Sequence, residues 1–284
     1  MKFLSICLIG LGFQLVLGAE VGRPSEEALR ESAATLKKAQ SLWNSRKPDQ
    51  AIQLLDSAIT DVPSAADLWE CRAQIRESQK NWESAAKDWT EVIRLAPTGA
   101  RHQRRAIVRF RQNQMDLALE DFDAANRLEP AQAPYNWQRG IALYYAKRFR
   151  DGREQFESHQ TVNPADVENA VWHFLCTARE LNLDEARRRL IPIEGDSRIP
   201  MRQVHQMFAG KCASSDVLDA AVKGDAPSWK ERRQRFYANL YLALYYEATQ
   251  RPEQTKRYLR EAVSLADPED YMGMVAQIHW KRIQ

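Results

Sequence analysis

The chain has 284 residues, of which 44% are hydrophobic and 28% charged, the balance of an ordinary globular protein with a buried core. It contains 11 glycines and 12 prolines and no stretch of biased composition, so no long segment is expected to be disordered. The formal net charge of +3 is too small to indicate a nucleic-acid-binding protein.

The first residues have the pattern of a secretory signal peptide. A lysine precedes an apolar run over residues 3–17, and small residues follow at positions 18 and 19. The run is shorter than the roughly 20 residues that span a bilayer, so a cleaved leader of residues 1–19 is favoured over a retained anchor. Cys7 lies inside the run, which argues against a lipoprotein. We expect export to a periplasm or to the exterior, without stable membrane insertion.

Residues 20–31 lead into a region of internal repeats. Prolines recur at intervals of 34, 33 and 34 residues, and small residues lie 12 and 24 positions before each of them. A bulky residue stands between the later small residue and the proline. The four sets are Ala39, Ala51, Leu55 and Pro63; Ala73, Ala85, Trp89 and Pro97; Ala106, Ala118, Phe122 and Pro130; Gly140, Gly152, Phe156 and Pro164.

Each marker has a physical role in a pair of antiparallel helices. The small residues let the helices approach closely, the bulky residue fills the space between neighbouring pairs, and proline ends the second helix. In these features the chain resembles the tetratricopeptide repeat (TPR) family, most clearly over residues 116–122 and 138–145. The resemblance implies an all-α, right-handed α-solenoid of helical hairpins, and it says little about function.

Five repeats are expected over residues 32–191. The fifth is degenerate, because Phe174 stands at its first small position. Residues 192–235 are predicted to form an irregular helical segment, with a helix beginning near Met201. A final TPR hairpin and an amphipathic capping helix are predicted for residues 236–284.

The C-terminal part is also similar to the NlpI-type TPR lipoproteins of the bacterial envelope. The likeness rests on the order of the segments 172–175, 207–210, 240–246 and 260–263. In that family such proteins are adaptors that gather peptidoglycan hydrolases and a processing protease. This chain lacks the family's lipid-anchor cysteine, so membrane tethering and dimer geometry do not carry over.

Motifs for catalysis and metal binding are absent from the sequence, which contains no HExxH, GxSxG, CxxC or phosphate loop. His173 and Cys176 have a spacing that could ligate a metal, but without a third ligand they are expected to form a packed core pair. Together with Cys71 and Cys212, Cys176 belongs to an odd, scattered set that predicts buried thiols rather than a disulfide framework. We predict no catalytic residue, no cofactor and no metal.

Three clusters of basic residues lie within residues 101–111, 187–189 and 230–235. Apolar residues are interleaved with them, so solvated helix faces account for the clusters, and an acidic partner is the alternative. Nucleic acid is not an expected partner of an exported protein.

The concave face of the solenoid is the candidate binding site. In TPR arrays the first helix of each hairpin lines this face, and in repeats three and four its residues are aromatic or apolar beside arginine, a composition typical of binding hot spots. The predicted partner-binding groove consists of Phe110, Arg111, Trp137, Ile141 and Tyr144. The alternative is that Trp137 and Tyr144 pack against a neighbouring helix.

The predicted function is that of an exported adaptor or scaffold for protein–protein interactions in the bacterial envelope. Peptidoglycan hydrolases or proteases are the partners that the NlpI-type resemblance implies. The alternative is a scaffold or assembly factor of a secretion or pilus apparatus. An enzyme is a third hypothesis, and it would require a convergent polar cluster that the sequence does not reveal. An oligomer is compatible with each of these functions.

Overall fold

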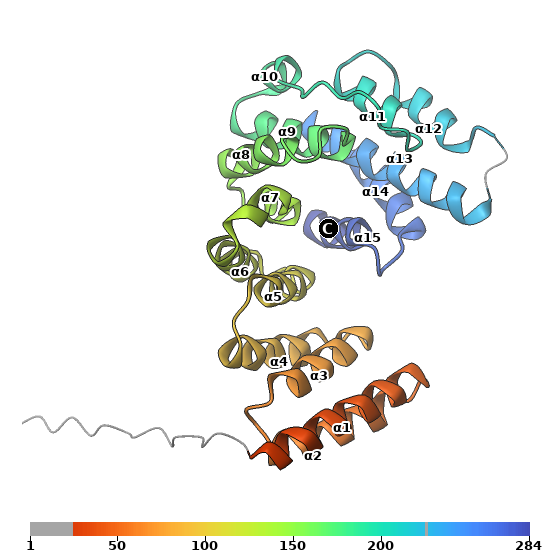
Figure 1. Cartoon of the computed structure of the whole chain (residues 1–284). Coiled ribbons are helices and arrows are strands. Elements are labelled where there is room, and N and C mark those ends of the chain that lie inside the picture. Colours follow the sequence, from red (N-terminus) through yellow and green to blue (C-terminus); the bar gives the residue numbers. More distant parts are fainter. Residues whose placement is uncertain (1–24, 225–226) are drawn as a thin grey trace, which may run out of the picture.

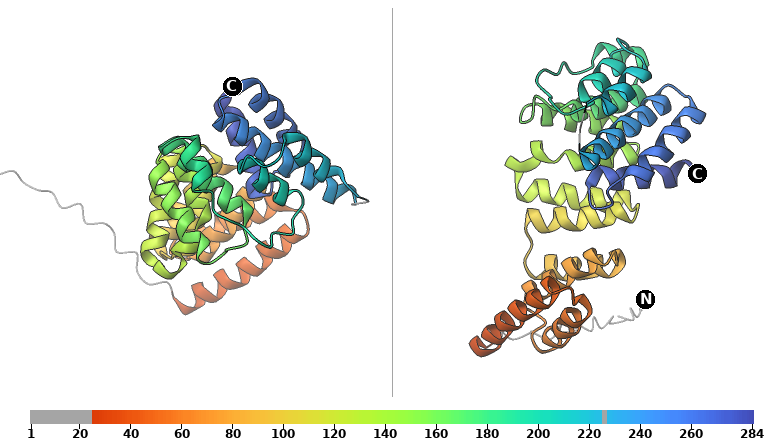
Figure 2. Two further views of the ribbon diagram at one scale, coloured as in Figure 1. Left: turned by 90° about the horizontal axis from the view of Figure 1, so that it is seen from above. Right: turned by 90° about the vertical axis from the view of Figure 1, so that its right-hand side faces the viewer.

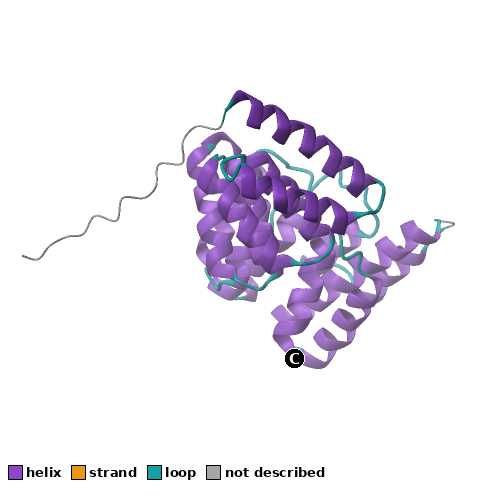
Figure 3. Cartoon of the chain, turned by 90° about the horizontal axis from the view of Figure 1, so that it is seen from below, coloured by secondary structure: helices purple, strands orange, loops and turns teal. Residues whose placement is uncertain are grey.

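A computed structural model describes residues 25–224 and 227–284, so the predicted leader lies outside the described residues. Within the described ranges every regular element is a helix (Figures 1 and 3), which confirms the predicted all-α solenoid. In chain order the elements are α1 (Glu26–Asn44), α2 (Pro48–Asp61), α3 (Ala66–Ser78), α4 (Trp82–Leu95), α5 (Gly99–Arg111), α6 (Met115–Leu128), the 3-10 helix η1 (Pro130–Tyr135), α7 (Trp137–Tyr145), α8 (Phe149–Gln160), α9 (Val167–Glu180), α10 (Leu183–Arg188), α11 (Met201–Phe208), α12 (Ser214–Val222), α13 (Ser228–Ala248), α14 (Pro252–Leu265) and α15 (Tyr271–Ile283).

The helices pair as hairpins that stack in sequence order from α1–α2 to α9–α10 (Figure 1). The small residues of the repeat lie where the two helices of a pair cross, and all of them are buried. At Gly140 a methyl group would lie 2.6 Å from the ring of Phe156, and at Gly152 it would lie 2.8 Å from the sulfur of Cys176. The helices around the fourth repeat therefore leave no room for a side chain at either of its small positions, where both residues are glycine.

A left-handed backbone residue makes the turn inside each regular hairpin. These residues have φ angles of 58° to 61°, and none of them is glycine. They are Arg46, Lys80, Asn113, Lys147 and Gln250. In the fifth repeat only Leu181 and Asn182 separate the two helices, with φ angles of −116° and −172°, and the second helix, α10, is only 6 residues long. The degenerate sequence of this repeat thus gives a different turn and a shortened hairpin.

The C-terminal helices fold back on the repeat row instead of extending it. Helix α13 begins at Ser228, inside the segment predicted to be irregular, and pairs with α14. Helix α15 then lies on the inner side of the stack, beside α5 and α7 (Figures 1 and 2). One continuous hydrophobic core extends from α5 to α15, whereas the first two hairpins have two small cores, the second of which also includes Val108 of α5. The molecule therefore consists of an N-terminal arm, α1–α4, and a closed C-terminal body, α5–α15.

Candidate partner-binding face

The five predicted groove residues lie on the inner helices α5 and α7. Helix α15 and the turn before it contact Phe110, Arg111 and Trp137, whereas Tyr144 packs against Phe149 and Trp172. The ring of Tyr271 stacks on Phe110 with centroids 5.5 Å apart and meets the edge of Trp137 at 4.9 Å. Phe110, Ile141 and Tyr144 have exposed fractions of 0%, 1% and 6%. The expectation that Phe110, Ile141 and Tyr144 face solvent is therefore wrong, because C-terminal helices of the same chain pack into the groove.

Polar contacts fix α15 and its neighbours in the groove. Arg111 donates to the carbonyl oxygen of Pro268 over 3.1 Å. The hydroxyl of Tyr144 donates to Glu247 over 3.1 Å, and that of Tyr145 lies 2.9 Å from the Nδ1 atom of His279. Burial raises the pKa of both tyrosines well above the usual value, so they remain hydrogen-bonding phenols at neutral pH.

Sequence reasoning missed the role of Tyr271 and His279 in this groove. The only available signal was the apolar face of the last helix, which predicts that the helix is covered but not by what. The alternative considered for Tyr144, packing against a neighbouring helix, agrees with its ring contacts to Phe149 and Trp172 at 5.6 and 5.4 Å.

The inner face continues beyond α15 onto the N-terminal arm. There, Glu70 and Glu77 of α3 pair with Arg101 and Arg104 of α5 at 2.7 and 2.9 Å. Gln74 lies between the two glutamates on the same face of α3 and is half-buried. A ladder of polar pairs thus links α3 to α5 at the edge of the arm.

Helix α1 carries a second set of inner-face residues. Leu36, Gln40 and Trp43 recur at the spacing of one helix face. Gln40 is exposed, while Leu36 and Trp43 pack partly against the small core of the first hairpin. No described helix covers this part of the face in the way that α15 covers α5 and α7 (Figure 1).

The arginines of the first basic cluster, residues 101–111, all have partners within the protein. Asp121, with an exposed fraction of 2%, accepts from Arg105 and Arg109 at 2.7 and 2.8 Å and lies 3.0 Å from the ring of His102. Asp88 accepts in the same way from Arg72 at 2.8 Å. Equivalent arginines and aspartates thus form buried ion pairs inside the second and third hairpins, and in the fourth hairpin Gln155 takes the place of the aspartate and accepts from Arg139.

The other two basic clusters also have acidic or backbone partners. Arg188 and Arg189 pair with Glu185 at 2.5 and 3.0 Å. Arg232 donates to the carbonyl oxygen of Leu265 at 3.1 Å. These contacts fit the interpretation of the clusters as solvated helix faces.

The predicted core pair of His173 and Cys176 is buried on α9. The Nε2 atom of His173 lies 3.3 Å from Glu157, and burial lowers the pKa of this histidine. Burial raises the pKa of the Cys176 thiol, which keeps it protonated. Across residues 25–224 and 227–284 no group of three His, Cys, Asp or Glu side chains is arranged to hold a metal ion. In the same ranges, no helix is long and apolar enough to cross a membrane.

Comparisons with known proteins identify the repeat. Residues 36–100 match the family model for the tetratricopeptide repeat. A tetratricopeptide repeat protein from Parabacteroides merdae ATCC 43184 superimposes with a TM-score of 0.58 and 16% identity, covering 90% of this chain and 99% of its own. The MamA protein superimposes with a TM-score of 0.53 and 11% identity, covering 69% of this chain and 97% of its own.

A double mutant of MamA from RS-1 superimposes with a TM-score of 0.50 and 16% identity, covering 58% of this chain and 90% of its own. At these identities the likeness shows the fold alone. The chain is therefore an all-α solenoid that carries a tetratricopeptide repeat match over residues 36–100.

Proposed function

We propose that this protein is an adaptor that binds a helical segment of another protein on the inner face of its N-terminal arm. The supporting observation is that this face is already filled by a helix over α5 and α7, where α15 lies, and continues uncovered over α1 and α3. Tetratricopeptide repeats generally serve as scaffolds with extended concave binding surfaces, which supports this proposal.

The expected partner segment is an amphipathic helix. Leu36 and Trp43 offer half-buried apolar surface, and Gln40 and Gln74 offer neutral hydrogen-bonding groups beside them. A helix that presents apolar side chains to the first pair and polar side chains to the second would match this face. The glutamates of α3 are already paired with arginines, so a strongly charged partner has little to gain there.

The proposed location is the bacterial envelope, on the basis of the predicted leader of residues 1–19. N-terminal sequencing of the mature protein should find a start near Ala19 or Glu20. Recovery of the intact leader in the membrane fraction would contradict export by cleavage. Peptidoglycan hydrolases or proteases are the proposed partners by the NlpI-type resemblance, and components of a secretion or pilus apparatus are the alternative.

The test is a crosslinked pull-down from envelope extract with matched variants. Gln40→Arg combined with Gln74→Arg places bulk and charge on the inner face of the arm. Gln50→Arg combined with Gln53→Arg adds the same charge on exposed positions of α2. We expect the wild type and the α2 variant to recover the same partner, and the inner-face variant to recover at least about tenfold less of it.

Equal recovery by both variants would exclude the arm as the binding face. Absence of any protein enriched over a control bait would contradict the scaffold function itself. Hydrolases or proteases among the recovered proteins would support the first envelope role, and secretion or pilus components would support the second.

A further inference from the structure

Two adjoining hollows lie at one end of the C-terminal body, beside the α7–α8 turn, the α13–α14 turn and the last turn of α15. The first hollow has a volume of about 150 Å³ and the second about 270 Å³. Glu247 of α13 and Ile283 of α15 line both of them. The two hollows are therefore parts of one depression in the surface.

Five cationic side chains and one carboxylate line this depression. Lys147, Arg179 and Arg282 line the first hollow, and Arg251 and Lys256 line the second. All five cations are exposed, and none of them forms an ion pair with any of the described residues. The arginines of residues 101–111 differ in this respect, because partners within the protein already bind them. The depression thus holds positive charge that the protein itself does not use.

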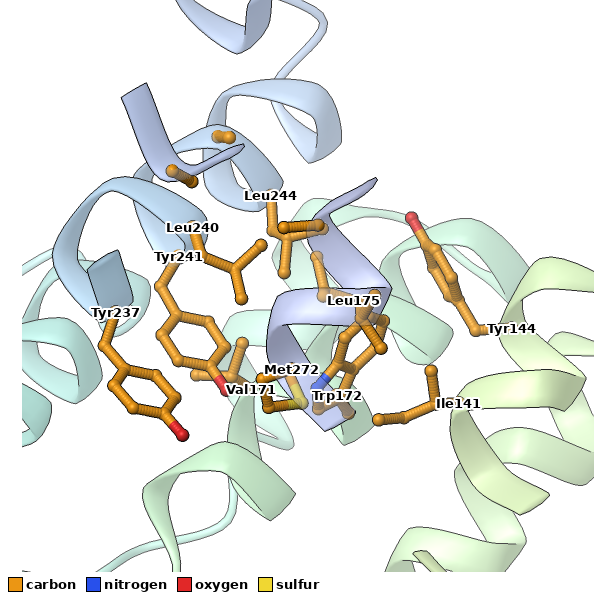
Figure 4. Close-up of a cluster of buried hydrophobic side chains, with 14 of the residues drawn as sticks. Ile141, Tyr144, Val171, Trp172, Leu175, Tyr237, Leu240, Tyr241, Leu244 and Met272 are labelled. Atoms are coloured by element: carbon orange, nitrogen blue, oxygen red, sulfur yellow. The ribbon is translucent and has the colours of Figure 1, made fainter. Parts of the chain in front are cut away.

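The single carboxylate is bound from the interior side. Glu247 accepts from the hydroxyl of Tyr144 at 3.1 Å and lies 3.5 Å from the Nε2 atom of His279. In Figure 4 this hydroxyl lies on the side of the Tyr144 ring that is away from Ile141 and Trp172. The side chain of Glu247 is only 25% exposed. It therefore leaves the five cations without a carboxylate partner.

Aromatic rings hold three of the cations in place. The guanidinium carbon lies over a ring at 5.4 Å for Arg179 and Phe149, at 5.2 Å for Arg282 and Tyr145, and at 6.0 Å for Arg251 and Tyr246. A ring under one face of a guanidinium fixes its position and leaves the N–H groups at its edge free. Among these three arginines only Arg282 donates a hydrogen bond to a described residue, the carbonyl oxygen of Tyr145 at 3.0 Å. Guanidinium groups placed in this way suit the two oxygens of a carboxylate.

The second hollow adds an apolar surface to these charges. Pro252, Thr255 and Ile283 line it together with Arg251 and Lys256. Its volume equals that of roughly nine waters, enough for one apolar side chain. The headgroups of a membrane would touch only the rim of such a hollow, whereas a side chain of a peptide can enter it. The arrangement therefore favours a protein segment over an anionic membrane.

We propose that this depression binds an acidic segment of a partner protein. A carboxylate of the segment enters the first hollow, where Lys147, Arg179 and Arg282 bind it. A neighbouring apolar side chain fills the second hollow, and a further carboxylate pairs with Arg251 and Lys256 at its rim. The depression belongs to the C-terminal body, so the proposal does not rest on partner binding to the N-terminal arm.

Fluorescence anisotropy of the full chain with short labelled peptides tests the site. The three probes have blocked ends and alternate glutamate with leucine, glutamine with leucine, or glutamate with serine. We expect the glutamate-leucine peptide to bind at least about tenfold more tightly than the glutamine-leucine peptide, because only the former has carboxylates for the cations. It should also bind severalfold more tightly than the glutamate-serine peptide, because serine leaves the apolar hollow unfilled. Added salt should weaken its binding.

Arg179→Gln combined with Lys256→Gln removes one cation from each hollow. Both side chains are exposed and donate no hydrogen bond to a described residue, so the melting temperature should stay nearly unchanged while binding weakens at least about tenfold. Arg127→Gln combined with Lys211→Gln is the matched control, since it removes the same charge from exposed positions outside the hollows. The control should bind the peptide as the wild type does, and so should the inner-face variant of the arm.

Equal weakening by the two pairs of substitutions would reduce the effect to net charge and overturn the proposal. Equal binding of the glutamate-leucine and glutamine-leucine peptides would overturn it as well. Equal binding of the glutamate-serine peptide would contradict the role given to the second hollow. Binding of phosphatidylglycerol vesicles without saturable binding of the glutamate-leucine peptide would assign the cations to a membrane surface instead of a protein partner.

Discussion

At the scale of single residues, the buried aspartates Asp88 and Asp121 bind basic side chains inside the second and third hairpins. Asp121 is the most heavily used, since two arginines and a histidine converge on it. Removing its charge leaves those groups without their partner in a desolvated place.

We expect Asp121→Asn to lower the free energy of unfolding by about 3 kcal/mol, as for other broken buried ion pairs. Asp151→Asn is the control, because Asp151 pairs with Arg148 on the surface and should cost less than about 1 kcal/mol. Urea unfolding followed by circular dichroism measures both. A similar small loss for the two variants would show that the buried network contributes no more than a surface pair.

Gly140 is the second residue whose identity the packing dictates. A methyl group there would lie 2.6 Å from the buried ring of Phe156. We therefore expect Gly140→Leu to destabilise the protein by about 1 to 3 kcal/mol or more, with Gly140→Ala at the lower end. An unchanged melting temperature for the leucine variant would show that the helices of the fourth hairpin are not in this register.

At the scale of helices, the position of α15 depends on a close approach between Gly273 and the backbone of Asp267. A methyl group at Gly273 would overlap the carbonyl oxygen of Asp267, which belongs to the turn that leads into the helix. Gly273→Ala should therefore displace the first turn of α15 and move Tyr271 away from Phe110.

Hydrogen exchange measured by mass spectrometry would detect this displacement. In Gly273→Ala we expect faster exchange in α15 and in the inner helices α5 and α7, with α1–α4 unchanged. Unchanged exchange in α5 and α7 would mean that α15 does not protect the groove.

How well each helix could be predicted depends on how far apart in the sequence the residues that fix its position lie. The hairpins α1 to α8 could be predicted because each spacing signal, such as Gly140 with Gly152, acts within one repeat. The position of α15 could not be predicted, because Tyr271 reaches Phe110 across most of the chain. The same separation explains the candidate site: the strip from Phe110 to Tyr144 lies on α5 and α7, and the sequence of these helices contains no sign of the C-terminal helix that packs on them.

At the scale of the whole molecule, burial of the strip from Phe110 to Tyr144 means that its aromatic residues contribute to the stability of the folded protein. Trp137→Ala combined with Tyr144→Ala removes contacts with Tyr271, Phe149 and Trp172. We expect this variant to melt early, since truncating a core aromatic costs about 3 to 5 kcal/mol. Thermal melting followed by circular dichroism measures the loss of stability. A melting temperature close to that of the wild type would show that the strip is exposed to solvent and not part of the core.

Stability against pH combines two opposing contributions. Burial lowers the pKa of His173 and His279. Their contribution to the free energy of unfolding is therefore complete above about pH 6.5, the ordinary pKa of histidine, and is lost as the pH falls below that value. The pKa of Glu168 is raised to about 7, so its contribution is present at acid pH and is lost as pH rises toward 7.

Glu168→Gln should therefore make the melting temperature fall more steeply between about pH 7 and pH 5.5, because only the histidine contribution remains. Glu185→Gln is the control, since the pKa of Glu185 is lowered by its bonds to Arg188 and Arg189 and its titration lies below this range. Differential scanning fluorimetry across the range gives both slopes. Parallel curves for the two variants would contradict the assignment to Glu168.

The seat of α15 in the groove also constrains how this protein can evolve. A repeat protein usually gains or loses whole hairpins by duplication and deletion, since each unit contacts only its neighbours. Here a duplication anywhere between α5 and α14 would carry the last helix out of register with Phe110 and Trp137. The arm α1–α4 carries no such tether, so insertions there would leave the body intact. Variation in length among descendants of this protein is therefore expected at the amino-terminal end of the array.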